Sequence, residues 1–336
     1  MSAPGDVDDE APDPAQPPAR PGLTTFTIEG RAAPGLFVVG WLATISGLAL
    51  LLIGALTPSG PMFYFVGPVL LTIGLIAGAG NQALERRARG EPYAGPSPYL
   101  VFVAIIPATF VVVFGAGVVL RLLLGSMRPS DELLALLTEG LQAVVFLGVL
   151  ALTVVGTGAL SWADMGWRRF DAAAARNFLL GIVWAVPVIF ATGLLANALV
   201  TAFGVEPEPP LPPTGTATGL LLELLAGAVL APVIEEALFR GFAITAWQRT
   251  VGDRGAILRA SLLFALAHVI NVSGTSDQIV GLIVVGFVTR LPIAFVLGSL
   301  FVRQKSIWAP LGLHVSFNAI LLILSALDVA SKGATG

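Results

Sequence analysis

The stretch "LFVVGWLATISGLALLLIGAL", residues 36–56, contains no charged side chain. A helix of about 20 apolar residues is long enough to cross the ~30 Å hydrocarbon core of a bilayer. Similar stretches recur along the 336 residues, of which 56% are hydrophobic and 12% are charged, with a mean hydropathy of +0.88. These runs are continuous, whereas the strands of a membrane β-barrel alternate apolar and polar residues. The sequence therefore predicts an all-α, polytopic transmembrane helical bundle.

The predicted bundle has about eight or nine membrane-spanning helices. One predicted segment, the seventh, is short, so it is either a full span or a re-entrant, partly buried helix. The predicted segments are 36–56, 62–83, 99–125, 137–160, 177–203, 218–247, 256–271, 279–303 and 307–327.

Basic residues in the short loops predict the orientation, because cytoplasmic loops carry an excess of Lys and Arg. They gather in alternate loops, whereas the loops between them, such as "TPSGP" (57–61) and "NVSGTSDQ" (271–278), contain almost none. We therefore expect a multi-pass protein of the cell membrane, in contact with lipid, whose N-terminus is cytoplasmic. The net charge of −3 does not indicate a nucleic-acid partner, and no pattern encodes the oligomeric state. The basic positions are Arg20, Arg31, Arg86, Arg87, Arg89, Arg168, Arg169, Arg176, Arg249, Arg254, Arg303 and Lys305.

The stretch "APVIEEALFR", residues 231–240, places three ionisable side chains inside a predicted span. Such groups cost roughly 2.5–3.5 kcal/mol each on insertion scales and usually face the bundle interior or water. Glu236 and Arg240 are one helical turn apart, acid first, which favours a pair. Glu235 is rotated by about 100° and can face elsewhere, and Pro232 is predicted to kink or loosen the helix. The cluster is either a structural ion cluster or part of a reactive site.

The two histidines of the chain belong to the same third of the sequence. His268 ends "FALAH", residues 264–268, and His314 opens "HVSFN", residues 314–318, with Asn318 one turn later on the same face. At ~1.5 Å per residue, Glu235, His268 and Asn318 each lie about 20 Å from the basic end of their own helix. Three helices thus place Glu, His and Asn at similar depth, which predicts that these side chains meet.

Peptide hydrolysis within a membrane needs groups of this kind. A glutamate withdrawn from water can act as a general base, and a nearby histidine can hold the water and pass a proton to the leaving amine. A second histidine and an asparagine amide can donate to the tetrahedral oxyanion. A divalent metal such as Zn²⁺ is the alternative. Metal-free water activation is favoured, because the chain lacks an HExxH motif and asparagine is a poor zinc ligand.

A further cation, Arg290, lies in the middle of the predicted span 279–303, within "VTRLPIAF" (288–295). Two interpretations are open. Arg290 binds a carboxylate of the substrate or of the site, or it is a structural partner on a helix kinked at Pro292.

Three motifs in order resemble those of the CPBP family, which comprises CAAX proteases and bacteriocin-processing enzymes and is also called the Abi family. "EEALFR" (235–240) is similar to its EExxxR motif, "FALAH" (264–268) to FxxxH and "HVSFN" (314–318) to HxxxN. Each motif alone is weak, but the ordered set in a membrane chain is specific. The resemblance covers about residues 160–327, and the first four predicted spans carry no recognised motif.

The resemblance implies an intramembrane endopeptidase of the glutamate type, with a peptide or protein as substrate. Carried over by position, Glu235 would activate the water with His268 as its partner, and His314 and Asn318 would form the oxyanion site. Glu236 and Arg240 would complete the first motif. Phe264 would shape the helix around His268.

The predicted organisation follows from the motifs and the composition. Residues 1–30, rich in Pro, Asp and Ala at their start, are expected to be a disordered cytoplasmic tail. Transmembrane helices without a recognised motif (31–160), a CPBP-like protease domain (161–327) and a second tail (328–336) are expected to follow.

The main alternative function is a non-catalytic membrane scaffold or accessory protein of the same fold. A proton-coupled transporter is disfavoured, because the polar groups cluster in one third of the chain rather than in two pseudo-symmetric halves.

Overall fold

The computed structural model describes residue 28 and residues 30–57, 62–205 and 214–333. All regular secondary structure in these residues is helical. Eight helical stretches are long and apolar enough to cross a membrane. The predicted all-α polytopic bundle is therefore confirmed, and the protein is a multi-pass membrane protein. The predicted tail 1–30 lies almost entirely outside the described residues.

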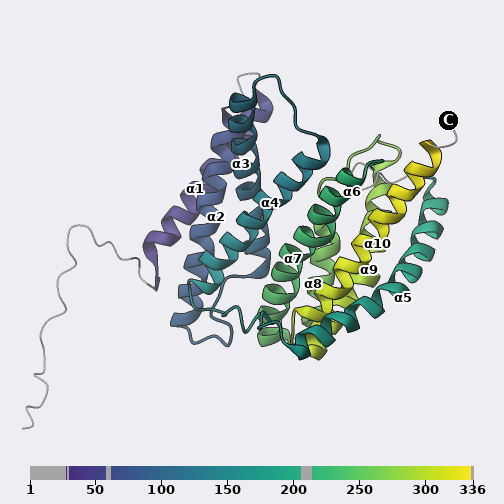
Figure 1. The fold of residues 1–336 in the computed structure, drawn as a ribbon. Helices are drawn as coiled ribbons and strands as arrows, with labels where there is room; N and C mark the ends of the chain where they lie inside the picture. The colour runs from purple at the N-terminus through teal and green to yellow at the C-terminus, as the bar shows by residue number, and fades with distance from the viewer. Residues whose placement is uncertain (1–27, 29, 58–61, 206–213, 334–336) are drawn as a thin grey trace, which may run out of the picture.

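The described residues form ten α-helices and three π-helical segments (Figure 1). The last helix runs six positions beyond the predicted end of the final span at 327. In chain order they are α1 (Pro34–Leu56), α2 (Phe63–Ala88), α3 (Pro98–Leu124), α4 (Asp131–Leu150), η1 (Ala151–Val155), α5 (Ala172–Phe203), α6 (Ala217–Glu223), η2 (Leu224–Leu230), α7 (Ala231–Glu235), η3 (Glu236–Ile244), α8 (Thr245–Ala267), α9 (Ile279–Gln304) and α10 (Trp308–Gly333).

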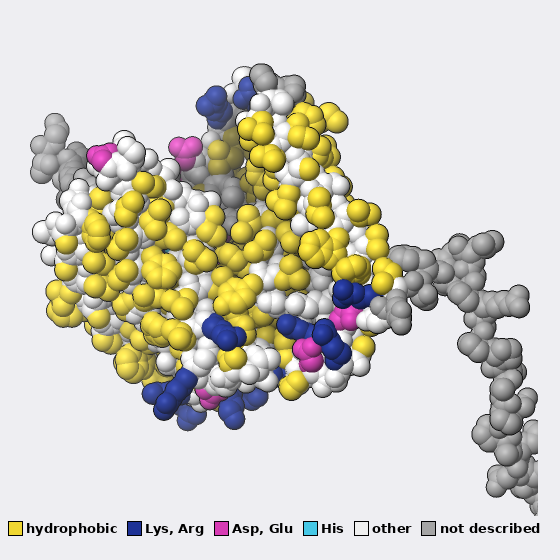
Figure 2. Space-filling model, turned by 180° about the vertical axis from the view of Figure 1, so that it is seen from behind, with side chains coloured by type: hydrophobic (Ala, Val, Ile, Leu, Met, Phe, Trp, Pro, Cys, Tyr) yellow, Lys and Arg dark blue, Asp and Glu magenta, His cyan; other side chains and the backbone are white. Residues whose placement is uncertain are grey.

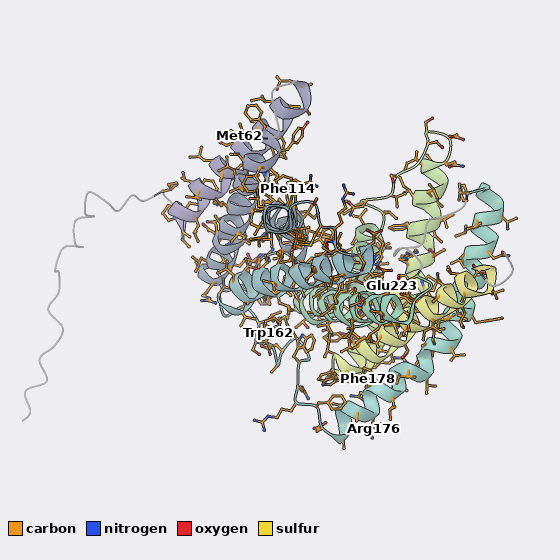
Figure 3. All side chains as sticks on the ribbon, turned by 45° about the horizontal axis from the view of Figure 1, so that its top comes forward. Met62, Phe114, Trp162, Arg176, Phe178 and Glu223 are labelled. Atoms are coloured by element: carbon orange, nitrogen blue, oxygen red, sulfur yellow. The ribbon has the colours of Figure 1, made fainter. Side chains whose placement is uncertain are left out.

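The N-terminal helices α1, α2 and α3 form a group on one side of the molecule, and α5 to α10 form the other. Helix α4 lies between the two groups (Figure 3) and contacts η2, α7 and η3. Within the first group, α1 and α2 approach closely through glycines. A Cβ on Gly47 would lie 2.7 Å from the carbonyl oxygen of Gly67, so no larger residue fits there without displacing α2. Close helix contacts through small residues are typical of membrane bundles.

The helical stretch 217–267 is 51 residues long, but it reverses direction at Gly252. This glycine has φ 71° and ψ 177°, a conformation that side chains disfavour. The rings of Phe239 and Phe264 lie only 5.3 Å apart, whereas a straight helix would separate them by about 37 Å. The stretch therefore forms two antiparallel segments, which correspond to the predicted spans 218–247 and 256–271.

The first of these segments alternates between π- and α-helix. The single turn α7 carries Pro232 and lies between the π-helical segments η2 and η3. The sequence predicts that Pro232 loosens the helix, and the π-helical turns beside it fit that expectation. π-helical turns inside α-helices often occur at functional sites.

Helix α10 is held against α5 at the level of the site. A Cβ on Gly181 of α5 would lie 2.5 Å from the backbone nitrogen of Leu313, and one on Gly312 would collide with the Phe178 carbonyl. The two glycines therefore allow the backbones to touch. This contact fixes the height of α10 directly beside His314.

Basic side chains gather at one end of the bundle. Figure 2 shows most Lys and Arg along its lower edge, with few on the opposite end. Arg86 and Arg87 lie in the last turn of α2 and Arg303 in the last turn of α9, which end on this side. This distribution agrees with the loops that the sequence assigns to the cytoplasm. The orientation itself stays a prediction.

Candidate active site

The two adjacent glutamates begin the site at the junction of α7 and η3. Glu236 and Arg240 form the ion pair that their spacing predicts, with Arg240 Nη1 donating to Glu236 Oε1 over 2.9 Å. Both side chains are buried, at 0% and 1% exposure. A buried pair is stable only when both charges are compensated, and here each compensates the other.

Glu236 also holds His314, which reaches it from α10. The Nδ1 atom of His314 lies 2.7 Å from Glu236 Oε1. Because a carboxylate only accepts hydrogen bonds, Nδ1 must carry the proton and donate it. The Glu236 carboxylate therefore fixes the ring orientation of His314 and turns Nε2 toward Glu235.

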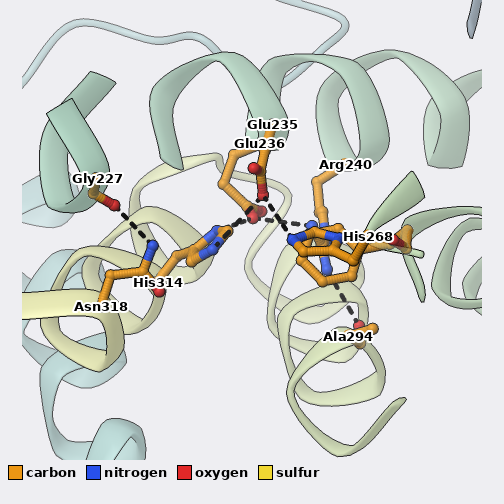
Figure 4. Close-up of polar contacts among 9 residues, drawn as sticks. Gly227, Glu235, Glu236, Arg240, His268, Ala294, His314 and Asn318 are labelled. Atoms are coloured by element: carbon orange, nitrogen blue, oxygen red, sulfur yellow. Dashed lines mark hydrogen bonds and ion pairs between the residues drawn. The ribbon is translucent and has the colours of Figure 1, made fainter. Parts of the chain in front are cut away.

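Glu235 lies between the two imidazoles (Figure 4). Its Oε2 atom is 3.7 Å from His314 Nε2 and 3.9 Å from His268 Nε2. These separations are too long for direct hydrogen bonds. Oε2 is buried and has no hydrogen-bond partner among the described residues. Two imidazoles from two other helices thus face the same carboxylate oxygen of Glu235.

His268 is oriented by its own helix. Its Nδ1 atom lies 2.8 Å from the carbonyl oxygen of Phe264, so Nδ1 donates and, in the neutral ring, Nε2 is a free acceptor. The Phe264 ring lies 4.4 Å from the His268 ring and 5.9 Å from the His314 ring. On the same ring, the guanidinium carbon of Arg240 is 4.4 Å from the centroid. Phe264 therefore packs the site together, as a cation–π and aromatic partner.

Among the described residues, Asn318 makes no hydrogen bond to Glu235 or to the imidazoles. Its Nδ2 atom donates to the carbonyl oxygen of Gly227 over 2.7 Å. In η2 the N–H of Ala231 bonds to the carbonyl of Ala226, five residues earlier. The same pattern would direct the N–H of residue 232 to Gly227, but Pro232 has none. Asn318 therefore satisfies a carbonyl that the proline leaves open, and its oxyanion role stays a prediction.

Two further charged groups interact electrostatically with Glu235. Glu139 of α4 is partly buried and repels Glu235, and Arg290 of α9 attracts it. Glu139 belongs to none of the three motifs, and the only signal for it in the sequence is its position as an ionisable residue inside the predicted span 137–160. Its helix belongs to the part of the chain without a recognised motif.

No metal site is formed by the described side chains. Among them, no group of three or more His, Cys, Asp or Glu is placed to hold a metal ion. Tetrahedral zinc needs such a set of close donors, and Asn318 already donates to a backbone carbonyl.

A pocket of ≈ 400 Å³ opens at the basic end of the bundle. Asp164, Arg168 and Lys305 are among its lining residues, and hydrogen bonds from the Ser161 backbone and hydroxyl lower the pKa of Asp164. The innermost lining residue on the glutamate helix is Thr245, about 15 Å along the helix from Glu235. The lining therefore does not include the carboxylate–imidazole cluster.

The fold and the cluster together define a polytopic membrane protein with a buried carboxylate–imidazole site. Residues 217–320 match the family model described as type II CAAX prenyl endopeptidase Rce1-like, so the chain carries a domain of this family. No curated protein and no solved structure matches the chain. The resemblance drawn from the three motifs is thereby confirmed. For the matched residues, the description of this family suggests an intramembrane protease that acts on a protein. The domain limits 161 and 327 stay predictions.

Proposed function

We propose that this protein is an intramembrane endopeptidase that hydrolyses peptide bonds of a membrane-associated peptide or protein by means of an activated water. The observation that carries the proposal is the position of Glu235 Oε2. It is buried, lacks a hydrogen-bond partner among the described residues and faces two imidazole nitrogens at 3.7 and 3.9 Å. Glu235 Oε2 and His268 Nε2 are both hydrogen-bond acceptors, so a water between them could donate one hydrogen to each.

Each residue then has a defined task. Glu235 takes one proton from the water as the oxygen adds to the carbonyl carbon. The C–N bond then breaks, and the leaving amine takes a proton returned by Glu235 or His268. His314 donates to the oxyanion through Nε2 when its ring carries both protons, because Nδ1 already donates to Glu236. Asn318 is proposed as the second donor.

The non-catalytic alternative explains only part of the cluster. Glu236, Arg240 and His314 satisfy one another, as side chains kept for packing would. Glu235 is not part of this network, since its Oε2 has no hydrogen bond to any described residue and instead faces two imidazole nitrogens at 3.7 and 3.9 Å. Glu236 Oε2 and Glu223 Oε1 are also buried without a partner among the described residues, so it is the pair of imidazoles around Glu235 that a role in packing leaves unexplained.

The test compares two glutamate-to-glutamine variants of the full chain, reconstituted in lipid vesicles with a library of N-acylated fluorogenic peptides. Glu235→Gln is expected to lower the cleavage rate by about 10²–10⁴-fold, because it removes the general base. Its melting temperature in detergent should stay close to that of the wild type. Glu223→Gln is the matched control, since this buried glutamate lies on the same helical stretch without a histidine partner, and it should retain activity. Full activity in Glu235→Gln would remove the proposed mechanism.

A further inference from the structure

Arg290 is a charged residue of the membrane region that neither the family motifs nor the proposed mechanism uses. It lies in the middle of α9 and is partly buried. Among the described residues, its one hydrogen bond runs from Nη1 to the hydroxyl of the adjacent Thr289 over 3.2 Å. It has no ion pair within 4.0 Å in the same part of the chain. Ionisable groups at this depth are costly and usually mark a functional path or partner.

The helix register places Arg290 at the level of the reactive groups. The Ala294 carbonyl lies 3.5 Å from Arg240 Nη2, which fixes Ala294 beside Arg240 (Figure 4). Arg290 is one turn away on the same face of α9, toward the end of the bundle from which α9 starts. On the two neighbouring segments, the same one-turn step leads from Arg240 to Glu236 and from Phe264 to His268. Arg290 therefore shares the layer of Glu235 and His268.

The two arginines near this layer differ in how closely an opposite charge approaches them. Arg240 contacts Glu236 at 2.9 Å, whereas Arg290 interacts with Glu235 and His268 through the field alone. Glu235 becomes neutral when it takes the proton of the water, and the neighbouring Glu236 is already paired with Arg240, so Arg290 loses the counter-charge with which it interacts. A guanidinium in a poorly solvated site binds carboxylates well, because its planar fork donates two parallel hydrogen bonds.

We propose that Arg290 forms an anion subsite that binds a carboxylate of the substrate on the leaving-group side of the scissile bond. This inference rests on the proposed function, because it takes His268 as the group that faces the leaving amine. Arg290 lies on α9, which packs against α8, and His268 is the residue that caps the end of α8, so Arg290 lies on that side. The carboxylate is either the carboxyl terminus of the substrate or an acidic side chain in the departing fragment. Arg290 is thus a specificity-determining residue of the protease.

The experiment uses the full chain in lipid vesicles with matched libraries of N-acylated peptides as the probe. One library lacks Asp and Glu and ends in a free carboxylate, a second differs only in ending in a carboxamide, and a third is amidated and carries one Glu at varied positions. Products are quantified by mass spectrometry. The measured quantity is the ratio of kcat/KM for a carboxylate library to kcat/KM for the uncharged one. A variant that is merely less stable lowers both values and leaves this ratio unchanged.

Wild-type protein is expected to prefer a carboxylate library by about tenfold or more, the range of charge-assisted hydrogen bonds. A higher kcat/KM for the library with a free carboxyl terminus would identify the terminal carboxylate as the group bound. A higher kcat/KM for the library with Glu would identify an acidic side chain. Arg290→Gln should reduce the preference to less than about twofold, mainly through KM, and Arg290→Lys should keep part of it because the charge remains. Arg303→Gln, a control at the other end of α9, should keep the wild-type ratio.

Two results would count against the subsite. Equal cleavage of all libraries by the wild type, or an unchanged preference in Arg290→Gln, overturns the anion subsite and leaves the proposed protease activity standing. No cleavage of any library by the wild type contradicts the proposed function itself, and the subsite falls with it.

Discussion

At the scale of single residues, the two adjacent glutamates have different surroundings and therefore different predicted roles. Glu236 accepts hydrogen bonds from Arg240 and His314 and is fully buried. Glu235 faces two imidazoles without bonding to either. A substitution at Glu236 should therefore disturb the fold, and the same substitution at Glu235 should disturb the chemistry.

Glu236→Gln is expected to lower the free energy of unfolding by roughly 3–5 kcal/mol, because it leaves the Arg240 charge buried and uncompensated. Unfolding of the purified protein in mixed micelles measures this quantity. Glu235→Gln serves as the comparison and should change it far less. Equal stability of the two variants would show that the Glu236–Arg240–His314 network does not support the fold as the geometry indicates.

At the scale of secondary-structure elements, Pro232 and Asn318 are linked across two helices. The proline removes the N–H that would bond the Gly227 carbonyl, and the Asn318 amide on α10 replaces it. The bond ties α10 to the π-helical segment η2 about one turn from His314. The irregular helix is thereby held in place by a residue that the family pattern assigns to the oxyanion.

A double-mutant cycle separates these two roles of Asn318. Asn318→Ala should cost about 1–3 kcal/mol of unfolding free energy, because it leaves a carbonyl unpaired. In a Pro232→Ala background, the new backbone N–H can reach Gly227, so the cost should shrink by about 1 kcal/mol. Additive costs would contradict the link.

Cleavage rates of the same four proteins test the oxyanion role. Loss of an oxyanion donor lowers kcat by about 10²–10³-fold. If Asn318 donates to the oxyanion, this loss should appear in both backgrounds, whether or not the proline is present. If Asn318→Ala leaves kcat close to that of its parent protein in both backgrounds, the role of Asn318 is limited to the hydrogen bond to the Gly227 carbonyl.

At the scale of the whole molecule, the site is enclosed by two groups of helices. The family match covers residues 217–320, but α4 from the N-terminal half packs against α7 and η3. Glu139 on α4 interacts with Glu235 through this contact. The N-terminal helices thus contribute charge to the surroundings of the site.

The orientation of the whole bundle is testable directly, because the sequence contains no cysteine. Single cysteines at the exposed positions Arg169, Ser126 and Ser276 can report the side of each loop. In intact cells, a membrane-impermeant maleimide should label Ser126→Cys and Ser276→Cys, but should label Arg169→Cys only after lysis, if the basic end is cytoplasmic. The reverse pattern would invert the orientation.

The sequence by itself determined the helical membrane fold, the family and the depth of the polar groups. Apolar segments long enough to cross a bilayer indicate membrane-spanning helices. Because the rise per residue of a helix is fixed, the position of a residue in its segment gives its depth in the membrane. The length of the short seventh segment leaves its path undecided, and the reversal at Gly252 in the structure shows that it returns beside Phe239.

Only the tertiary structure decided which polar groups touch. Depth places Glu235, His268 and Asn318 in one layer, with His314 one turn from Asn318, but the rotation of each helix sets the contacts. That rotation depends on packing between distant segments, such as the glycine contact between α5 and α10. Asn318 therefore turns to Gly227 for reasons that no local pattern contains, since this hydrogen bond joins segments far apart in the chain.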